Sequence, residues 1–230
     1  MFKFFYSLLD VLLPRYCYGC KQVLVLGEKV LCSNCFVELS RTMNHFNKNN
    51  DLVNNISINF PIKHAVAFIN YDTNSLSSHL IHKFKYNDDI IIGKYLTNLF
   101  CNELKDKVWI KEIDYVIALP LHRIRKATRG YNQSEIIAKE IGKRFNIEHR
   151  TDCVKRIKYN KSQTKMSKEG RWKNVENIFA LRNASLLEGK HILLVDDLVT
   201  TGASLNSCIK TLSTIKDIQI SVLVLGKTII

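Results

Sequence analysis

Apolar residues along the 230-residue chain follow two kinds of pattern. Four short apolar runs are typical of buried parallel strands, and they cover residues 64–70, 115–120, 191–197 and 220–226. Elsewhere apolar residues recur every three or four positions, as on one face of a helix. These faces consist of Leu76, Leu80, Ile81 and Phe84; of Ile92, Leu96, Leu99 and Phe100; of Ile137, Ile141 and Phe145; and of Leu205, Cys208, Ile209 and Leu212. The alternation of strand and helix predicts an α/β fold with a doubly wound parallel sheet.

A polar segment divides the chain into two parts. Residues 42–60 are rich in Asn and lack apolar periodicity, so we expect a linker or irregular connection there. An N-terminal module is expected at residues 1–41 and a larger domain at residues 61–230. The chain begins with MFKFFYSLLDVLL, where a signal peptide is the alternative to an amphipathic helix. Asp10 interrupts this stretch and no small-residue cleavage site follows, which favours the helix. No apolar run reaches membrane-spanning length, so we do not expect a transmembrane protein.

Four of the seven cysteines form two closely spaced pairs, CYGC (Cys17 and Cys20) and CSNC (Cys32 and Cys35). Two such turns supply four thiolates for a tetrahedral Zn²⁺ and leave no open position for water, which indicates a structural site. Gly27, between the pairs, favours a small hairpin that brings them together. A set of unligated core or redox thiols is the alternative. The other three are expected to be small core residues: Cys101, Cys153 and Cys208. This use of cysteine indicates a reducing cytoplasm.

An acidic pair follows the third apolar run, in the stretch HILLVDDLVTTGAS. Asp196 and Asp197 stand at the carboxyl end of a predicted strand, where ligands of such sheets bind. The residues from Thr200 to Ser204 begin the next helix, and its N-terminus, hydroxyls and glycine suit a phosphate. Because neighbouring carboxylates accept hydrogen bonds from a vicinal diol, a ribose 5-phosphate fits both halves.

The acidic pair has three other interpretations, and the sequence tests two of them. A Walker B strand also ends in Asp-Asp, but the chain has no G-x-x-x-x-G-K-[ST] loop, which argues against a P-loop NTPase. A receiver domain would carry its acidic pair after its first strand, whereas this pair lies near the C-terminus. The plainest alternative is a solvated strand end capped by Thr.

The chain is strongly basic, with 34 Lys and Arg against 21 Asp and Glu and a formal net charge of +13. Its hydrophobic content of 46% is that of a globular protein rather than a disordered or fibrous one. Residues 150–173 include nine basic and two acidic residues, and residues 114–130 include four basic residues and one acidic residue. With Tyr131, Tyr159 and Trp172 interspersed, this pattern predicts a face that binds single-stranded nucleic acid. The expected contact residues are Arg123, Arg125, Lys126, Lys158, Lys161, Lys165, Arg171 and Trp172. Charge that serves only solubility is the alternative.

Several motifs together resemble one family. The stretch LLVDDLVTTGAS is similar to the phosphoribosyl-pyrophosphate (PRPP) signature of type I phosphoribosyltransferases. The cysteine pairs, FKY at residues 84–86 and ALPLHRIRKATRGYNQS at residues 118–134 resemble segments of the ComF family of bacterial competence proteins. So does R-x6-Q-x7-R-x2-N-x4-F, which comprises Arg156, Gln163, Arg171, Asn174 and Phe179. Departures from the family pattern are Asn160 for Thr, Gly170 for Glu and Asn177 for Gly.

The resemblance implies a type I phosphoribosyltransferase fold with an N-terminal zinc module and a set of ligand contacts. Asp196 and Asp197 would hold the ribose hydroxyls, and Arg129 would bind a phosphate. The implied 5-phosphate loop is Thr200, Thr201, Gly202, Ala203 and Ser204, and the implied pyrophosphate loop, with Mg²⁺, is Pro120, Leu121 and His122. Gln163, Arg171 and Asn174 would donate to the same ligand or to nucleic acid, with a surface ion pair as the alternative for Arg171.

Three function classes follow from the residues and the resemblance. The first is a competence factor for DNA uptake and transformation that handles single-stranded DNA and binds PRPP or a related phosphoribosyl ligand with Mg²⁺. The second is an active phosphoribosyltransferase, for which neither the acceptor base nor a catalytic residue is identified by the sequence. The third is a zinc-bearing scaffold with a regulatory ligand site. The resemblance also implies a competence helicase at the membrane DNA channel as partner, and a location in the cytoplasm or at the inner face of the cytoplasmic membrane.

Overall fold

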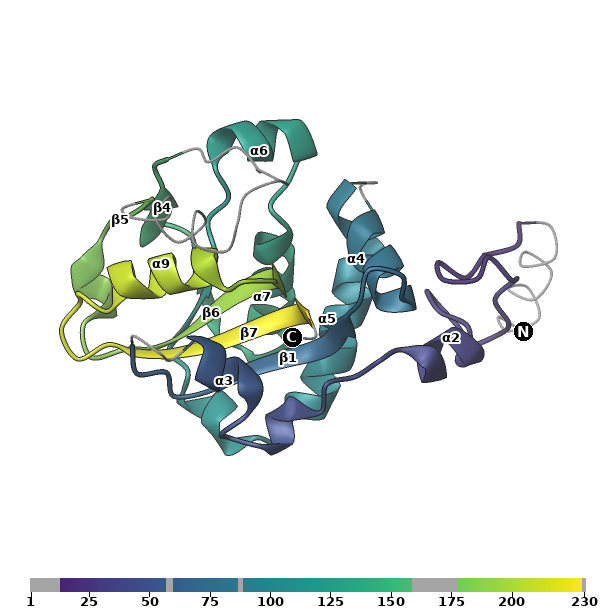
Figure 1. Ribbon diagram of the computed structural model, residues 1–230, viewed down its shortest axis with the longest axis horizontal. Coiled ribbons are helices and arrows are strands. Elements are labelled where there is room, and N and C mark those ends of the chain that lie inside the picture. Colours follow the sequence, from purple (N-terminus) through teal and green to yellow (C-terminus); the bar gives the residue numbers. More distant parts are fainter. Residues whose placement is uncertain (1–12, 57–59, 87–88, 159–177, 229–230) are drawn as a thin grey trace.

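A computed structural model describes residues 13–56, 60–86, 89–158 and 178–228 of the chain. Its centre is a sheet of five strands in the order β1-β7-β6-β2-β3 (Figure 1). These strands are β1 (Ala65–Tyr71), β7 (Gln219–Thr228), β6 (His191–Val199), β2 (Tyr115–Ala118) and β3 (Glu148–Arg150). All four pairings in this sheet are parallel. The predicted parallel sheet is therefore confirmed.

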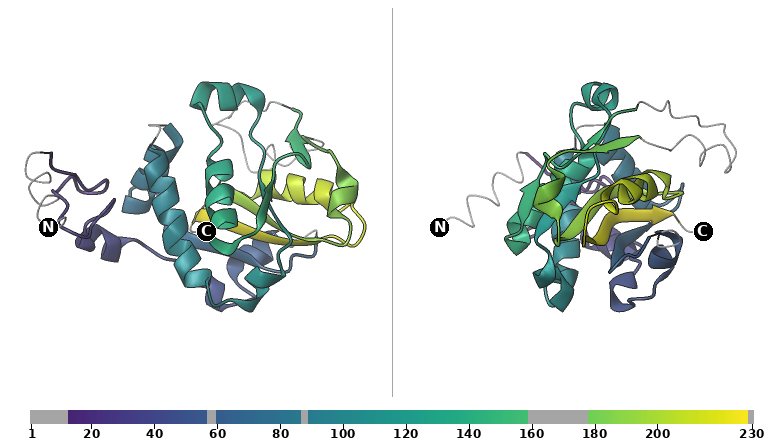
Figure 2. Two further views of the ribbon diagram at one scale, coloured as in Figure 1. Left: turned by 180° about the vertical axis from the view of Figure 1, so that it is seen from behind. Right: turned by 90° about the vertical axis from the view of Figure 1, so that its left-hand side faces the viewer.

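Helices cover both faces of the sheet, as a doubly wound fold requires (Figures 1 and 2). One face packs against α4 (Leu76–Tyr86), α5 (Ile90–Leu104) and α7 (Gln133–Phe145), and the other against α3 (Asp51–Ile56) and α9 (Ala203–Leu212). Successive strand residues point to opposite faces. In β6, Leu193 and Val195 join the first apolar cluster, whereas Ile192 and Leu194 join the second.

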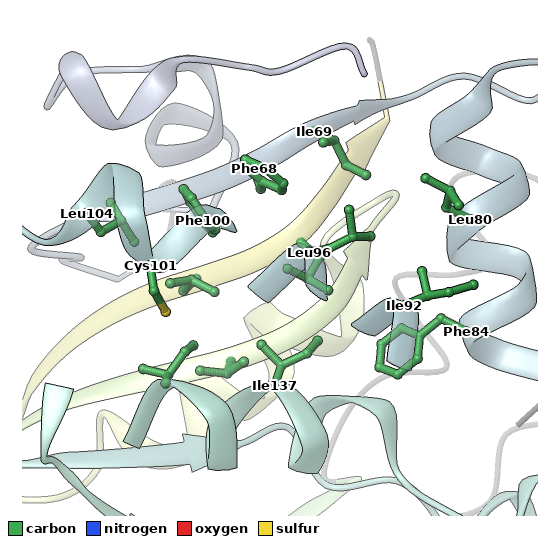
Figure 3. Packing of buried hydrophobic residues seen from close by; sticks show 14 of the residues in the cluster. Phe68, Ile69, Leu80, Phe84, Ile92, Leu96, Phe100, Cys101, Leu104 and Ile137 are labelled. Atoms are coloured by element: carbon green, nitrogen blue, oxygen red, sulfur yellow. The ribbon is translucent and has the colours of Figure 1, made fainter. Parts of the chain in front are cut away.

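The first cluster shows how closely the predicted helix faces pack on the sheet (Figure 3). Phe68 of β1 stacks on Phe100 of α5, with ring centroids 5.1 Å apart. Phe84 of α4 lies against Gly93 of α5, where an added Cβ would come within 2.3 Å of the Phe84 ring. Any side chain at this glycine would therefore push the two helices apart.

Three short strands are absent from the sequence prediction. They are β3, and the antiparallel pair of β4 (Val154–Arg156) and β5 (Phe179–Leu181), which forms a separate sheet. Each has only three residues, too few for an alternation of apolar and polar positions to be read. The amphipathic helix expected at the start of the chain falls at residues 1–12, outside the described residues.

The segment interpreted as a linker, residues 42–60, contains regular structure. It forms a 3-10 helix, η1 (Asn44–Phe46), and α3, where Leu52 and Ile56 are buried. Asn44 and Asn50 are buried as well. The side-chain oxygen of Asn44 accepts from the Ala67 amide at 3.0 Å, and the Asn50 side chain donates to the Ala65 carbonyl at 2.8 Å. The expectation of an irregular connection is therefore wrong for these residues, because its asparagines satisfy backbone groups of β1.

The remaining elements of the described residues are short. They are α2 (Ser33–Glu38), α6 (Arg123–Arg129) and the 3-10 helices η2 (Val108–Glu112) and η3 (Ala184–Leu187). Within the described ranges, no helix combines the length and the apolar composition needed to cross a membrane.

Candidate functional site

The acidic pair lies where β6 passes the end of β2. Asp196 is half-buried and Asp197 is 7% exposed. The Ser134 hydroxyl, at the start of α7, donates to Asp196 Oδ1 at 2.9 Å, and the Asp197 amide donates to the same oxygen at 2.9 Å. Lys85 Nζ, at the end of α4, lies 3.3 Å from Asp197 Oδ1. Three elements thus hold one oxygen of each carboxylate, and these contacts do not involve Asp196 Oδ2 or Asp197 Oδ2.

Charged groups around the pair come from several elements. Burial raises the pKa of Asp196 to about 7, the charge on Asp197 adds to this rise, and Ser134 and Lys85 oppose it. Burial lowers the pKa of the Arg156 guanidinium on β4, and the charge on Arg125 lowers it further. The Asp196 carboxylate opposes this shift, so Arg156 lies within its electrostatic range. The site therefore places a carboxyl that titrates near neutral pH within electrostatic range of the Arg156 guanidinium.

Ligand binding is expected to depend on pH through Asp196. An ionised carboxylate accepts a ribose hydroxyl better than a protonated one, so binding strengthens as pH rises through the raised pKa. With a pKa of about 7, the ionised fraction rises about tenfold between about pH 6 and pH 8. Calorimetric titration of ribose 5-phosphate at both pH values should show this gain in the wild type. In Asp196→Asn only the titration of the ligand phosphate, near about pH 6, should remain. Equal pH dependence in both proteins would contradict the assignment.

The same group affects folding stability. The folded-state pKa of Asp196 is raised, so the folded state retains a proton that the unfolded state has lost. The contribution of Asp196 is therefore favourable at acidic pH, and the free energy of unfolding falls as pH rises from about 4 to about 7.

The predicted 5-phosphate loop forms a pocket next to the acidic pair. The pocket has a volume of about 100 Å³, and its lining consists of Asp196, Leu198, Val199, Thr200, Thr201, Gly202, Ala203, Ser204 and Leu205. Gly202 precedes α9 with a φ of +71°, a conformation that favours glycine. The first turn of α9 follows at once, with the Asn206 amide donating to the Gly202 carbonyl at 2.8 Å. The loop thus presents hydroxyls and a helix N-terminus to the space that Asp196 also lines.

The predicted pyrophosphate loop lies beside the acidic pair because β2 and β6 are neighbours. Ala118 pairs with Val195, and the Leu119 amide donates to the Val195 carbonyl at 2.8 Å. Pro120, Leu121 and His122 therefore leave the sheet level with Asp196 and Asp197. The loop passes directly into α6, where Nδ1 of His122 accepts from the Ile124 amide at 3.3 Å.

Arg129 ends α6 and faces α4. Its guanidinium lies 5.0 Å from the centroid of the Tyr86 ring and donates to the Tyr86 hydroxyl at 3.2 Å and to Gln133 Oε1 at 3.3 Å. Lys85, which pairs with Asp197, directly precedes Tyr86 in the chain. The contact with Tyr86 therefore holds Arg129 close to Lys85. The structure thus brings the predicted phosphate-binding arginine to the same side of the sheet as the acidic pair.

The residues predicted to contact nucleic acid lie in two groups. On α6, Arg123 and Lys126 are exposed, and Arg125 is half-buried. Lys126 pairs with Glu135 at 3.0 Å. Lys158 is exposed after β4. Outside the described residues lie Lys161, Lys165, Arg171 and Trp172, together with Gln163 and Asn174 and the departures Asn160, Gly170 and Asn177. Their roles remain predictions.

Sequence reasoning did not assign roles to Lys85, Tyr86 and Ser134. Each touches the acidic pair or Arg129. The signal was present, because the first two belong to FKY and the third ends ALPLHRIRKATRGYNQS. What the sequence lacks is the sheet order that brings these segments together.

The four paired cysteines form a cluster suited to a metal ion. The sulfur atoms of Cys17, Cys20, Cys32 and Cys35 all lie within 4.8 Å of one another. Four sulfurs placed about 2.3 Å from a tetrahedral ion are about 3.8 Å apart, so the cluster matches such a site. Burial raises the pKa of Cys17, but amides of Cys32, Cys20 and Gly19 outweigh this and lower it to about 7. The cluster could hold a metal ion. An antiparallel bridge between Tyr16 and Val23 encloses the first cysteine pair. Between the pairs the chain turns at Gly27, where the Glu28 amide donates to the Val25 carbonyl at 3.0 Å.

The cysteine cluster packs on α4. A Cβ added at Gly19 would lie 2.8 Å from both Cys35 Sγ and the Leu76 side chain, so only glycine allows this approach. Cys17, Cys32 and Cys35 belong to the same apolar cluster as the helices on this face. The other cysteines, Cys101, Cys153 and Cys208, are buried in the core, as predicted.

Comparisons with known proteins bear on the class of the domain. Residues 127–226 match a family model described as phosphoribosyl transferase domain. Competence protein F of Haemophilus influenzae is 30% identical over 139 residues, which cover 59% of this chain and 61% of that protein. Competence protein ComFC of Bacillus subtilis is 29% identical over 143 residues, which cover 59% of this chain and 53% of that protein. The chain thus spans less than two thirds of the length of these curated relatives. The structure of an adenine phosphoribosyltransferase from Leishmania donovani aligns with 70% of this chain and 83% of its own, at 11% identity and a TM-score of 0.42.

The parallel sheet and the match to a phosphoribosyl transferase domain define a phosphoribosyltransferase-like protein. The motifs outside the phosphoribosyltransferase domain narrow the class further. The curated relatives are competence proteins, which supports the resemblance of this chain to the ComF family.

Proposed function

We propose that the chain is a competence factor for DNA uptake whose site binds PRPP or a related ribose phosphate together with Mg²⁺. One observation carries the proposal. Asp196 lines the same pocket as the loop from Thr200 to Ser204, so acceptors for ribose hydroxyls adjoin donors for a phosphate. A diphosphate would extend toward Pro120, Leu121 and His122, with Mg²⁺ bridging its oxygens and water.

The active phosphoribosyltransferase is the second candidate, and the intact acidic pair and phosphate loop favour it. In that reaction a nucleophile attacks the anomeric carbon of PRPP and pyrophosphate leaves. The experiment that separates the two is a binding and turnover assay with PRPP and Mg²⁺ across a panel of nucleobases. PRPP binding without turnover, beside binding of single-stranded DNA, supports the competence factor. Release of pyrophosphate with one base supports the enzyme. Absence of PRPP binding contradicts both.

The metal at the cysteine cluster is proposed to be a structural Zn²⁺. Four thiolates occupy every position of a tetrahedral ion and leave none for a reacting water. A competence helicase at the membrane DNA channel remains a proposed partner, and its support is the family resemblance.

Single-stranded DNA is proposed to run across the mouth of the phosphoribosyl site. The support is the basic content of residues 114–130 and 150–173. Binding of this kind tolerates any sequence and weakens steeply with salt, because each phosphate contact releases counterions.

Replacement of Lys158, Lys161 and Lys165 by Ala is expected to lower the slope of log affinity against log salt by about two. Each phosphate contact on a single strand contributes about 0.7 to that slope. Trp172→Ala should instead weaken binding by about 1–3 kcal/mol and leave the slope unchanged, because a stacked base carries no counterion term. Fluorescence anisotropy with a labelled oligonucleotide across a salt series measures both. Absence of single-strand binding by the wild type at low salt would exclude this part of the proposal.

A further inference from the structure

A second pocket lies between the N-terminal module and α4, and we call it the tyrosine pocket. Its volume is about 450 Å³, and its described lining residues are Arg15, Tyr16, Tyr18, Lys21, Lys29, Lys83, Asp89 and Ile91. Among these residues four are cationic and one is acidic. It shares no described lining residue with the pocket at the phosphate loop and is several times larger. The tyrosine pocket thus joins positive charge and aromatic surface at a place the phosphoribosyl site does not use.

Two of the lysines converge on one ring. Lys83 Nζ lies 5.4 Å and Lys21 Nζ lies 5.9 Å from the centroid of the Tyr18 ring. The neighbouring Lys21 lowers the pKa of Lys83, burial lowers it further, and Asp89 and Cys17 oppose the shift. Two ammonium groups held so close repel each other, and an anion between them removes that cost. The arrangement therefore suits a negatively charged ligand.

Tyr16 adds an aromatic surface to the same pocket. It is 53% exposed although its backbone is held by the bridge to Val23. An exposed ring on an ordered backbone is a surface on which an unpaired base stacks at low entropic cost. Phosphate-binding lysines beside a stacking ring are the two parts of a single-strand binding site.

The α4 helix connects the tyrosine pocket to the acidic pair. Lys83 lines the pocket, and Lys85, two residues later, pairs with Asp197. Residues two apart in a helix lie within one turn but point to different sides. Lys83 and Lys85 therefore point to different sides of one turn of α4. The N-terminal module lies on the side of α4 away from β6 and β7 (Figure 1).

We propose that the tyrosine pocket binds the phosphodiester backbone of single-stranded nucleic acid, with Lys21 and Lys83 on a phosphate and a base stacked on Tyr16. The inference rests on the proposed handling of single-stranded DNA and extends it to a second contact point on the far side of α4. A strand that passes the phosphoribosyl site is then held by the N-terminal module as well.

The cysteine cluster offers another reason for the lysines. Four thiolates and one Zn²⁺ carry a net charge of −4 + 2 = −2, and Cys17 attracts Lys83. If neutralising this charge were their whole role, removing the lysines would weaken zinc retention and leave nucleic-acid binding unchanged. The experiment therefore measures zinc content beside binding.

The test is anisotropy of a labelled oligothymidine across a salt series, with the full-length zinc-loaded protein. Lys21→Gln/Lys83→Gln is expected to lower the slope of log affinity against log salt by about 0.7, because the two lysines share one phosphate contact. Tyr16→Ala is expected to weaken binding about 5- to 150-fold with no change in slope. Zinc content and PRPP affinity should match the wild type in both variants.

The matched control is Lys143→Gln/Lys216→Gln, which removes the same charge from exposed positions at the end of α7 and before β7. If the salt slope of Lys21→Gln/Lys83→Gln is no lower than that of this control, the inference is overturned, whether or not the variant loses zinc. The phosphoribosyl proposal would still stand if this variant binds PRPP. A wild type that binds PRPP but no oligothymidine would overturn the inference together with the proposed DNA handling.

A site-specific readout covers the case in which a variant fails to fold. An oligonucleotide that carries 5-iodouracil should crosslink on irradiation to the peptide that contains Tyr16 and Tyr18 in the wild-type protein. Unlabelled oligothymidine should abolish the crosslink. Absence of a crosslink to this peptide would contradict a nucleic-acid site. If inorganic phosphate displaces the crosslink as strongly as oligothymidine does at matched ionic strength, the pocket is a site for small anions instead.

Discussion

Replacement of Cys35 by Ala is expected to lower the bound zinc from one equivalent to less than about half an equivalent per chain and to unfold the N-terminal module. The apolar residues that this module buries are few, chiefly Leu24, Val30, Leu31 and Leu39. A structural zinc supplies about 10–16 kcal/mol to the folding of small zinc-binding peptides, which is more than so small a core can replace. Metal analysis of protein purified without chelator, with hydrogen exchange across residues 13–41, measures both effects.

Cys101→Ala is the matched control for this prediction, because Cys101 is equally buried but lies outside the cysteine cluster. This variant should keep a full equivalent of zinc and an N-terminal module as protected as in the wild type. Full zinc occupancy in Cys35→Ala, or little zinc in the wild type, would show that the four thiols do not form a structural site.

Asp196→Asn/Asp197→Asn is expected to weaken PRPP or ribose 5-phosphate binding by about 10- to 100-fold and to leave the fold intact. Each carboxylate that accepts a ribose hydroxyl makes a charge-assisted hydrogen bond worth about 1.5–3 kcal/mol, and an amide accepts less strongly. The substitution also removes the partner of Lys85. Calorimetric titration in the presence of Mg²⁺ measures the loss.

Asp106→Asn/Asp217→Asn makes the same change of charge at two exposed positions away from the strand ends that carry the site. Asp217 already has a left-handed backbone, with a φ of +54°, which asparagine adopts readily. PRPP affinity of this control should equal that of the wild type. If the variant at the acidic pair is well folded and binds as tightly as the control, the carboxylates do not contact the ribose.

The sequence predicts the parts of this molecule that depend on neighbouring residues. The four longer strands, the helix faces and the cysteine cluster follow from local spacing, and the structure contains them. The contacts that complete the site join distant segments. Ser134 and Asp196 are 62 residues apart, and Arg129 and Tyr86 are 43 apart. Such contacts follow from the order of strands in the sheet, and local patterns carry no information about that order.

Short or polar segments escape prediction for a related reason. The three residues of β4 pair with β5 across an intervening segment of 22 residues, from position 157 to position 178. Neither strand carries enough residues to show a period, and the pairing supplies the stability that the local sequence lacks. In residues 42–60 the asparagines suggested a loop, because asparagine is common in turns. There its amide groups serve instead as partners for a neighbouring strand.

The contacts that residues 40–50 make with β1 bear on how copies of this chain meet. β1 is an outer strand, and outer strands offer unpaired amides and carbonyls on which another chain can add a strand. Here the Thr42 amide already donates to the Phe68 carbonyl at 2.9 Å, and the Asn70 amide to the Ser40 carbonyl at 2.8 Å. Together with Asn44 and Asn50, these bonds occupy the edge from within the molecule. Growth of the sheet into a second copy at β1 would first require residues 40–50 to detach.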